Sequence, residues 1–221
     1  MDTQLVVELC ILLFIIVIAR ILFLIHKNTT GYSRYASEKR TKACKTVICI
    51  GSGGHTTEML SLIENIDFNK YSPRYYIIAS SDTTSLTKVE KLEESKSSNG
   101  DNGEYYITKI PRSRVVHQSY FTSIFTTLFS ILYSIPLVLK IRPDLILCNG
   151  PGTCIPICGL GFLLKCAFIT NTKIVFIESF CRTKTLSLTG KILIYLADNF
   201  LVQWPSLKQK VKRADYIGQL M

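Results

Sequence analysis

The residues best suited to chemistry lie in a glycine-rich segment between an apolar run and an amphipathic one, which is the pattern of a strand, a tight turn and a helix. Glycines allow the turn to approach a ligand closely, and the helix start offers unpaired N–H groups and the positive end of its dipole. The segment therefore predicts a diphosphate site made of Gly51, Ser52, Gly53, Gly54, His55 and Thr56.

Two nucleotide-binding motifs are the alternatives for this glycine segment. A dinucleotide fingerprint needs glycine where Thr56 stands and an acid about 20 residues further on, whereas the nearest acid after the second predicted strand is Asp82. The lysine-containing loop of nucleotide triphosphatases is absent. A glycine turn without any ligand stays open as the structural alternative.

Two further clusters follow predicted strands. Asn149, Gly150, Pro151, Gly152 and Thr153 form a second glycine-rich turn after the fourth strand. Glu178 and Arg182 follow the fifth strand, where the carboxylate can serve as a general base and the guanidinium can hold phosphate. A simple turn requirement and a surface ion pair are the alternatives. Because ligands bind beyond the carboxyl ends of parallel strands, we expect the three loops to form one site.

The elements that position these loops alternate along the chain. The predicted strands span 46–50, 75–79, 105–110, 145–148, 173–178 and 199–202, and the predicted helices span 56–66, 81–98, 120–139, 155–168 and 188–197. This alternation predicts βαβ units and a parallel sheet. The fold expected is α/β, a single Rossmann-like domain.

The N-terminal region predicts a membrane anchor. Residues 5–25 are almost wholly apolar and long enough to cross a bilayer, and basic residues follow them. We expect a lumenal tip (1–4), a transmembrane anchor (5–25), a basic linker (26–45) and a cytosolic domain (46–221). The sequon at Asn28 then faces the cytosol and stays unmodified. An interfacial amphipathic helix is the alternative.

The amino-acid composition limits the classes of molecule that the chain is expected to bind. The 221-residue chain carries a net charge of +10, which suits phosphate-bearing substrates or an anionic membrane. Nucleic acid is disfavoured, because the basic residues cluster beside the anchor rather than along one helix with aromatics. The eight cysteines lack paired metal-ligand spacing, so reduced and mostly buried thiols are expected.

The predicted helix 120–139 contains no charged residue. It has an apolar stripe that includes Phe121, Phe125 and Leu132, with serine and threonine on the opposite face. Two interpretations stay open: this helix touches the membrane or a lipid chain, or it packs on the sheet as an ordinary crossover helix whose polar face a partner covers. A second transmembrane span is disfavoured, because it would put the fourth strand across the membrane from the first.

Five segments in order resemble one family: the glycine segment 51–59, Cys148–Thr153, Glu178–Arg182, Asp198–Trp204 and Tyr216–Gly218. The family is the membrane-anchoring subunit of the eukaryotic UDP-N-acetylglucosamine transferase of dolichol-linked oligosaccharide synthesis. The glycine segment resembles, more distantly, that of the bacterial transferase acting on the lipid-linked peptidoglycan precursor.

The resemblance implies the N-terminal, acceptor-side half of a GT-B glycosyltransferase at the endoplasmic reticulum membrane. A separate soluble subunit would hold the donor UDP-GlcNAc, and together they would add the second GlcNAc to GlcNAc-diphosphodolichol. No cofactor is expected in this chain, and metal-independent chemistry is expected because no Asp-x-Asp motif occurs. The preceding enzyme of the pathway is a further possible partner.

If the chain takes part in this transfer reaction, His55 is the first candidate for the catalytic base and Glu178 is the second. The partner is expected to dock near the tail residues Tyr216, Ile217, Gly218, Leu220 and Met221. The isolated chain is expected to be inactive. Two other functions stay open: a non-catalytic membrane scaffold that recruits a partner, and a membrane-bound NAD(P) oxidoreductase.

Overall fold

The computed structural model describes residues 3–30, 40–98, 100, 103–114 and 118–220. In this part of the chain seven strands form one sheet in the order β3-β2-β1-β4-β5-β6-β7, and every neighbouring pair is parallel. The strands are β1 (Thr46–Cys49), β2 (Arg74–Ala79), β3 (Tyr105–Ile110), β4 (Leu145–Cys148), β5 (Lys173–Ile177), β6 (Asn199–Val202) and β7 (Asp215–Tyr216). The predicted Rossmann-like α/β class is confirmed.

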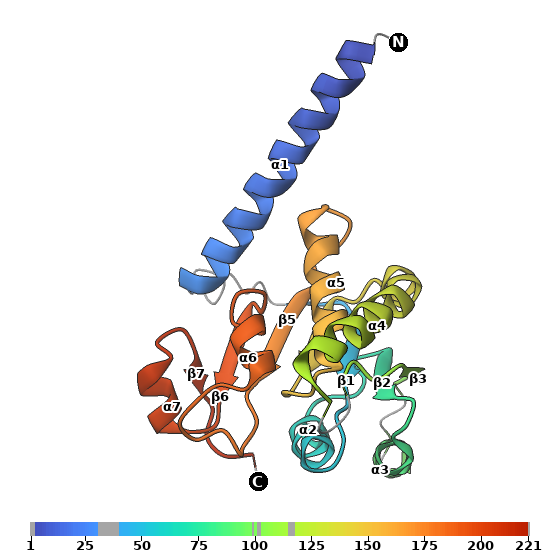
Figure 1. Cartoon of the computed structure of the whole chain (residues 1–221). Coiled ribbons are helices and arrows are strands. Elements are labelled where there is room, and N and C mark those ends of the chain that lie inside the picture. Colours follow the sequence, from blue (N-terminus) through green and yellow to red (C-terminus); the bar gives the residue numbers. More distant parts are fainter. Residues whose placement is uncertain (1–2, 31–39, 99, 101–102, 115–117, 221) are drawn as a thin grey trace.

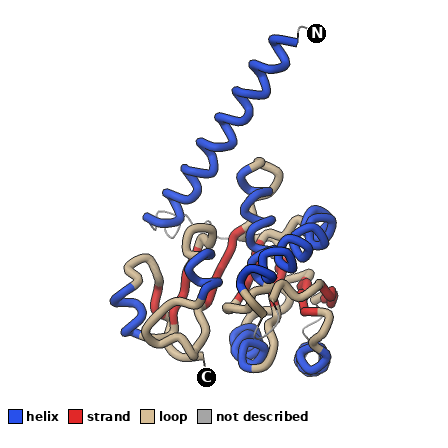
Figure 2. Tube along the Cα trace, viewed as in Figure 1, coloured by secondary structure: helices blue, strands red, loops and turns tan. Residues whose placement is uncertain are grey.

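Helix α1 (Thr3–Thr30) precedes the sheet, and the other helices connect its strands and cover both of its faces (Figures 1 and 2). These connecting helices are α2 (Gly54–Glu64), α3 (Thr83–Ser98), α4 (Tyr120–Ile141), α5 (Cys154–Cys166), α6 (Leu188–Leu193) and α7 (Pro205–Lys210). The short elements α7 and β7 were not predicted, and α6 ends four residues before the predicted boundary.

Strand residues alternate between two apolar cores, as the two-residue period of a strand requires. Val47 and Cys49 point into the core shared with α4, α5 and α6. Ile48 and Ile50 point into the core shared with α2 and α3. All four side chains are almost fully buried, and burying one such isoleucine contributes about 1.5–3 kcal/mol. The apolar strands are therefore stable only with helices on both sides.

Helix α1 extends away from the domain in Figure 1, and it is long and apolar enough to cross a membrane. It runs from Thr3 to Thr30, so the first five residues of the predicted linker 26–45 are helical instead. Residues 31–39 of that linker lie outside the described residues. The end of α1 packs on the domain, where Leu24 is buried in the core.

Helix α4 is oriented with its apolar stripe outward. Phe121, Phe125 and Leu132 are 72%, 62% and 66% exposed, whereas Ser130 and Ser134 are fully buried. The Ser130 hydroxyl donates to the Pro111 carbonyl at 3.0 Å. Of the two interpretations, the one in which a partner covers the polar face of α4 is therefore wrong, because Ser123, Ser130 and Ser134 are buried within this domain. Helix α4 also passes the length and composition test for a span, yet it connects two strands of one sheet.

Candidate functional site

The three loops predicted from the sequence meet at one edge of the sheet. Strands β1 and β4 are neighbours, and the chain leaves them in opposite directions, which opens a crevice beyond their carboxyl ends. A pocket of about 540 Å³ lies there, and its lining includes His55, Gly150, Ser179 and Arg182. The expected convergence of the loops after β1, β4 and β5 is therefore confirmed.

Backbone constraints explain two glycines of the loop after β1. Gly53 has φ +62°, a conformation that residues with a side chain rarely adopt. A Cβ on Gly51 would lie 2.7 Å from the His55 Cβ and 2.9 Å from the Pro151 Cγ. Gly53 therefore permits the turn, and Gly51 allows the loops after β1 and β4 to pack together. Ser52 lines a smaller neighbouring pocket, and Gly53 and Gly54 are exposed.

Thr56 is placed differently from the prediction. It is 1% exposed, and its hydroxyl contacts the Gly51 carbonyl and the Ser85 hydroxyl inside the fold. A buried hydroxyl with two protein partners is not available to a diphosphate. The predicted role of the Thr56 hydroxyl as a diphosphate ligand is therefore wrong. Thr56 instead stabilises the glycine loop and the start of α2.

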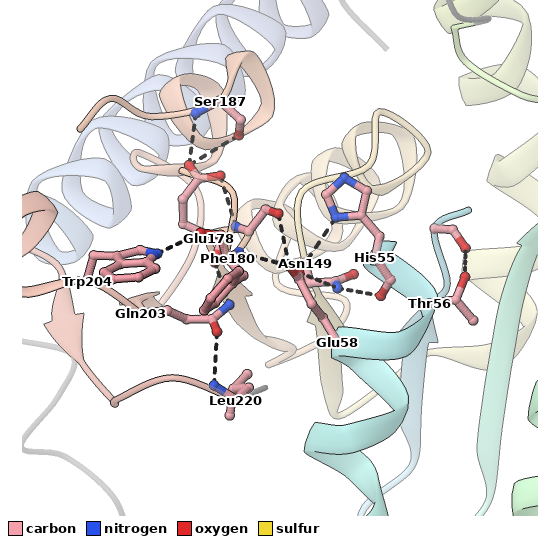
Figure 3. A network of polar contacts seen from close by, with 12 residues as sticks. His55, Thr56, Glu58, Asn149, Glu178, Phe180, Ser187, Gln203, Trp204 and Leu220 are labelled. Carbon is pink, nitrogen blue, oxygen red and sulfur yellow. Dashed lines mark hydrogen bonds and ion pairs between the residues drawn. The ribbon is translucent and has the colours of Figure 1, made fainter. Parts of the chain in front are cut away.

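His55 lies at the border of the pocket, on the first turn of α2 (Figure 3). Its side chain is 32% exposed, and its Nδ1 atom lies 3.8 Å from Oε2 of Glu58. The Glu58 carboxylate raises the pKa of His55, although partial burial of the imidazole acts in the opposite direction. His55 can therefore carry a proton at the edge of an open pocket.

Glu58 connects all three loops, a role that the sequence did not reveal. Its carboxylate accepts hydrogen bonds from the Phe180 N–H at 2.9 Å, the Ser179 hydroxyl at 3.1 Å and the Asn149 amide at 3.3 Å. Burial alone would raise the pKa of Glu58, but His55 and the hydrogen bonds from Phe180 and Ser179 lower it. Glu58 is thus a buried anion that orients the imidazole and holds the crevice together. Its one sequence signal was an acid three residues after His55 on the buried face of α2.

The loop after β4 makes room for the histidine. Gly150 has φ +89°, and a Cβ there would lie 3.1 Å from Cε1 of His55. The side chain of Asn149 is 2% exposed and donates to the His55 carbonyl at 2.6 Å. Pro151 and Gly152 line both pockets, and Thr153 lines the smaller one. Residues 150–153 of the predicted cleft loop therefore line the crevice, and the buried Asn149 side chain connects this loop to α2.

Glu178 does not face the pocket, so its candidacy as a base needs correction. The residue is fully buried. Its carboxylate accepts from the Ser187 N–H at 3.0 Å, the Ser187 hydroxyl at 3.2 Å and the Ser179 N–H at 3.2 Å. Burial raises the pKa of Glu178 despite these bonds. A Cβ on Gly190 would lie 2.2 Å from the carboxylate, so no space remains beside it. Glu178 instead anchors the segment that leads into α6.

Three arginines and His55 give the site a basic lining. Arg182 is exposed at the rim of the larger pocket, as the sequence predicted. Arg114 lines both pockets and Arg112 the smaller one, although neither was assigned to the site from sequence. Their position just after β3, at the same edge of the sheet, could have indicated from the sequence that they line the site. Among the described residues that line these pockets there is no carboxylate, so the crevice suits an anion.

The tail predicted to bind a partner is partly exposed. Tyr216 and Ile217 are 48% and 38% exposed, and Gly218 turns the chain with φ +83°. The Leu220 N–H donates to the Gln203 side chain at 3.1 Å, so the tail is held against β6. Met221 lies outside the described residues. Partner binding at this surface stays a prediction.

Several acidic and thiol side chains of the described part of the chain are used within the fold. This part of the chain contains no group of three or more histidine, cysteine or acidic side chains that could hold a metal ion. Asp82 is buried, and its carboxylate accepts from the Ser85 N–H and hydroxyl at the start of α3. Asp82, the acid nearest to the position that a dinucleotide site would require, therefore stabilises the start of α3. All eight cysteines are free thiols, and six of them are buried, as predicted.

The amino-acid sequence matches a known protein family. The family described as "Oligosaccharide biosynthesis protein Alg14 like" matches residues 46–220. The "UDP-N-acetylglucosamine transferase subunit ALG14" of Mus musculus is 50% identical over 184 residues, covering 81% of this chain and 84% of the relative. The subunits of the same name from Homo sapiens and Schizosaccharomyces pombe are 47% and 45% identical, and they cover 79% and 83% of this chain and 82% and 86% of their own length.

A solved structure with a related arrangement is that of MurG from Acinetobacter baumannii. It is 12% identical, has a TM-score of 0.45, and the match covers 72% of this chain and 41% of that one.

Proposed function

The chain belongs to the Alg14-like family of oligosaccharide biosynthesis proteins, and from this premise we propose that it is the acceptor-binding, membrane-anchored subunit of a UDP-GlcNAc transferase. In this proposal a soluble partner holds UDP-GlcNAc, and the pair adds a second GlcNAc to GlcNAc-diphosphodolichol at the cytosolic face of the endoplasmic reticulum. The chain itself is then the N-terminal half of a GT-B enzyme, inactive when alone.

The observation that carries the proposal is the basic crevice around His55. The loops after β1 and β4 meet there, and Arg114 and Arg182 line the same pocket without an opposing carboxylate among the described lining residues. Such a surface suits a diphosphate, which guanidinium groups and a helix N-terminus both stabilise. We infer that the acceptor's diphosphate binds against Gly53, Gly54 and these arginines.

The pair His55 and Glu58 supports a mechanism. We propose that the imidazole accepts the proton of the acceptor's 4-hydroxyl as that oxygen forms its bond to the anomeric carbon of the donor. The bond from that carbon to UDP breaks at the same time, and its electron pair leaves with UDP. Glu58 then stabilises the imidazolium through the 3.8 Å ion pair. Glu178 takes no part in proton transfer, because its carboxylate is bonded within the fold.

Two helices support a membrane location for the chain. Helix α1 is long and apolar enough to cross a bilayer, and the apolar face of α4 is exposed beside the pocket that Ser123 and Thr127 line. We infer that α1 spans the bilayer with its basic end cytosolic, and that α4 rests on the surface.

The test is a transfer assay with UDP-GlcNAc and a GlcNAc-diphospho-lipid. It compares this chain alone, the soluble partner alone and the mixture of both. Product in the mixture only is the expected result. Absence of product from a mixture whose chains are folded and bound to each other would reject the proposal and favour the scaffold. A Gly53→Val chain separates binding from assembly, because loss of assembly in this variant would make the loop structural.

A further inference from the structure

The cytosolic end of α1 is packed into the domain rather than joined to it only through the following segment. Leu24 is 2% exposed and belongs to the core cluster that α4, α5 and α6 share, and Ile21 and Ile25 pack against that cluster. The last turns of a helix otherwise suited to lipid are therefore part of the folded domain.

Asn28 fastens this junction with its side chain. It is 1% exposed, and its amide donates to the Tyr195 carbonyl at 3.3 Å and to the Leu196 carbonyl at 3.0 Å, both just after α6. These carbonyls lie at the end of a short helix, where carbonyl groups lack partners within the helix. The contact is polar, directional and buried, which distinguishes it from the lipid-compatible surface of the rest of α1.

Arg213 closes the junction from the C-terminal side. Its Nε donates to the Asn28 carbonyl, and its terminal nitrogen donates to the Ala197 carbonyl. Its guanidinium carbon also lies 5.8 Å from the centre of the Phe200 ring, on β6. One arginine near the end of the chain thus ties α1 to the segment that connects α6 with β6.

The position of this junction relative to the bilayer gives it a consequence. The apolar stretch of α1 ends near Ile25, and Asn28 is three residues further, about 4.5 Å along a helix axis. The junction lies just before β6, so it fixes the edge of the sheet where the strands begin at the level of the lipid head groups. The crevice lies at the opposite edge, so the way the domain is held at the junction determines how far the crevice stands from the diphosphate of an embedded lipid.

We propose that Asn28 and Arg213 form a latch that makes the membrane helix and the domain one rigid unit, and so sets the height and orientation of the crevice over the bilayer. They are positioning residues, remote from the pocket. The proposal rests on the proposed function only where it names a lipid-linked acceptor. A freely tethered domain would reach an embedded diphosphate in many orientations, and most would be unproductive.

The sequence provides a matched pair of variants. Asn28→Ala and Thr30→Ala both destroy the sequon Asn28-Thr29-Thr30, but only the first removes a contact to the domain. The Thr30 hydroxyl bonds within its own helix, to the His26 carbonyl at 2.9 Å. A difference between the two variants therefore reports on the latch and not on glycosylation. Arg213→Ala tests the same junction from the other side.

The experiment uses the full chain with its soluble partner in phospholipid nanodiscs. Transfer from UDP-GlcNAc is measured to a long-chain GlcNAc-diphospho-lipid in the same disc and to a short-chain, water-soluble analogue. We expect Asn28→Ala and Arg213→Ala to lower transfer to the embedded acceptor by about tenfold and to leave the soluble acceptor unaffected. Thr30→Ala should behave as the unaltered chain with both acceptors.

Hydrogen exchange of the amides in residues 24–30 provides a measurement independent of activity. These amides should exchange faster in both latch variants than in Thr30→Ala. Unchanged exchange, unchanged transfer to the embedded acceptor, or equal losses with both acceptors would each overturn the latch. Absence of transfer by the unaltered chain to either acceptor would reject the proposed function instead, and the exchange rates would still decide whether the latch exists.

Discussion

The Nδ1 atom of His55 lies 3.8 Å from Oε2 of Glu58, one turn further along α2, and the same carboxylate accepts bonds from the loop after β5. The imidazole at the pocket is therefore coupled to the residues that hold the crevice in shape. A change at Glu58 alters both the charge beside His55 and the packing of the three loops.

Glu58→Gln tests this coupling through the pH dependence of transfer. The carboxylate raises the pKa of His55, so its removal lowers that pKa. If neutral His55 is the base, activity is lost as the pH falls through this pKa, and the acidic limb of the profile must move to lower pH in the variant. We also expect the rate at the optimum to fall by roughly 10- to 100-fold.

A pH profile of kcat over pH 5–9 checks this prediction, with Glu64→Gln as the control because that acid lies at the exposed end of the same helix. An alkaline limb that moves to lower pH, with the acidic limb unchanged, would show that His55 acts as a cation that binds the diphosphate.

Glu178→Gln distinguishes a structural residue from a catalytic base. The carboxylate supports Ser187 and Ser179, so loss of one acceptor oxygen should lower the free energy of unfolding by about 1–3 kcal/mol. The folded variant should keep transfer within severalfold of the unaltered chain. Thermal unfolding and initial rates measure the two effects. A loss of about 10²–10⁴-fold in rate with unchanged stability would restore Glu178 as the base.

Gly53→Val should abolish acceptor binding, because a β-branched residue strains at φ +62° and the loop must adopt another path. Gly159→Ala is the matched control, since the Cβ added there meets no atom within 4 Å and alanine favours a helix. Acceptor binding and partner pull-down are measured on both variants. Retained acceptor affinity in Gly53→Val would contradict the diphosphate site.

The exposed face of α4 predicts contact with lipid. A tryptophan at Phe125, which is 62% exposed, should be quenched by brominated lipids, with the single native Trp204 as a constant background. Lys91→Trp on α3 is the control, because α3 covers the other face of the sheet. Equal quenching at both positions would argue against a membrane-facing α4.

Ile217→Asp should weaken assembly with the soluble subunit. Ile217 is 38% exposed beside β7, so a charge there disrupts an apolar interface, with an expected loss of at least tenfold in affinity. Calorimetric titration of the partner measures it. Unchanged affinity, with Lys212→Asp as the control for added negative charge, would place the partner elsewhere.

Local sequence patterns were enough to predict the parallel sheet and the edge of the sheet where the site lies. Short apolar runs separated by helical periods specify βαβ units, and the carboxyl ends of parallel strands share one edge. The loops at Gly51, Asn149 and Glu178 were therefore expected to converge, and they do. Local patterns carry this information because strand and helix periods depend on neighbouring residues alone.

Which side chains face the crevice could not be predicted from these local patterns, because it depends on how the loops pack together. Glu178 and Thr56 carry the right groups at the right loops, yet both are turned into the fold, where Ser187 and Ser85 bind them. Glu58 lies within the glycine segment but was given no role, and Arg114 reaches the site from a loop that no motif marked. Side-chain direction at a loop depends on contacts between segments far apart in the chain, and no local pattern records those contacts. The same holds for Asn28, whose partners lie 167 and 168 residues away.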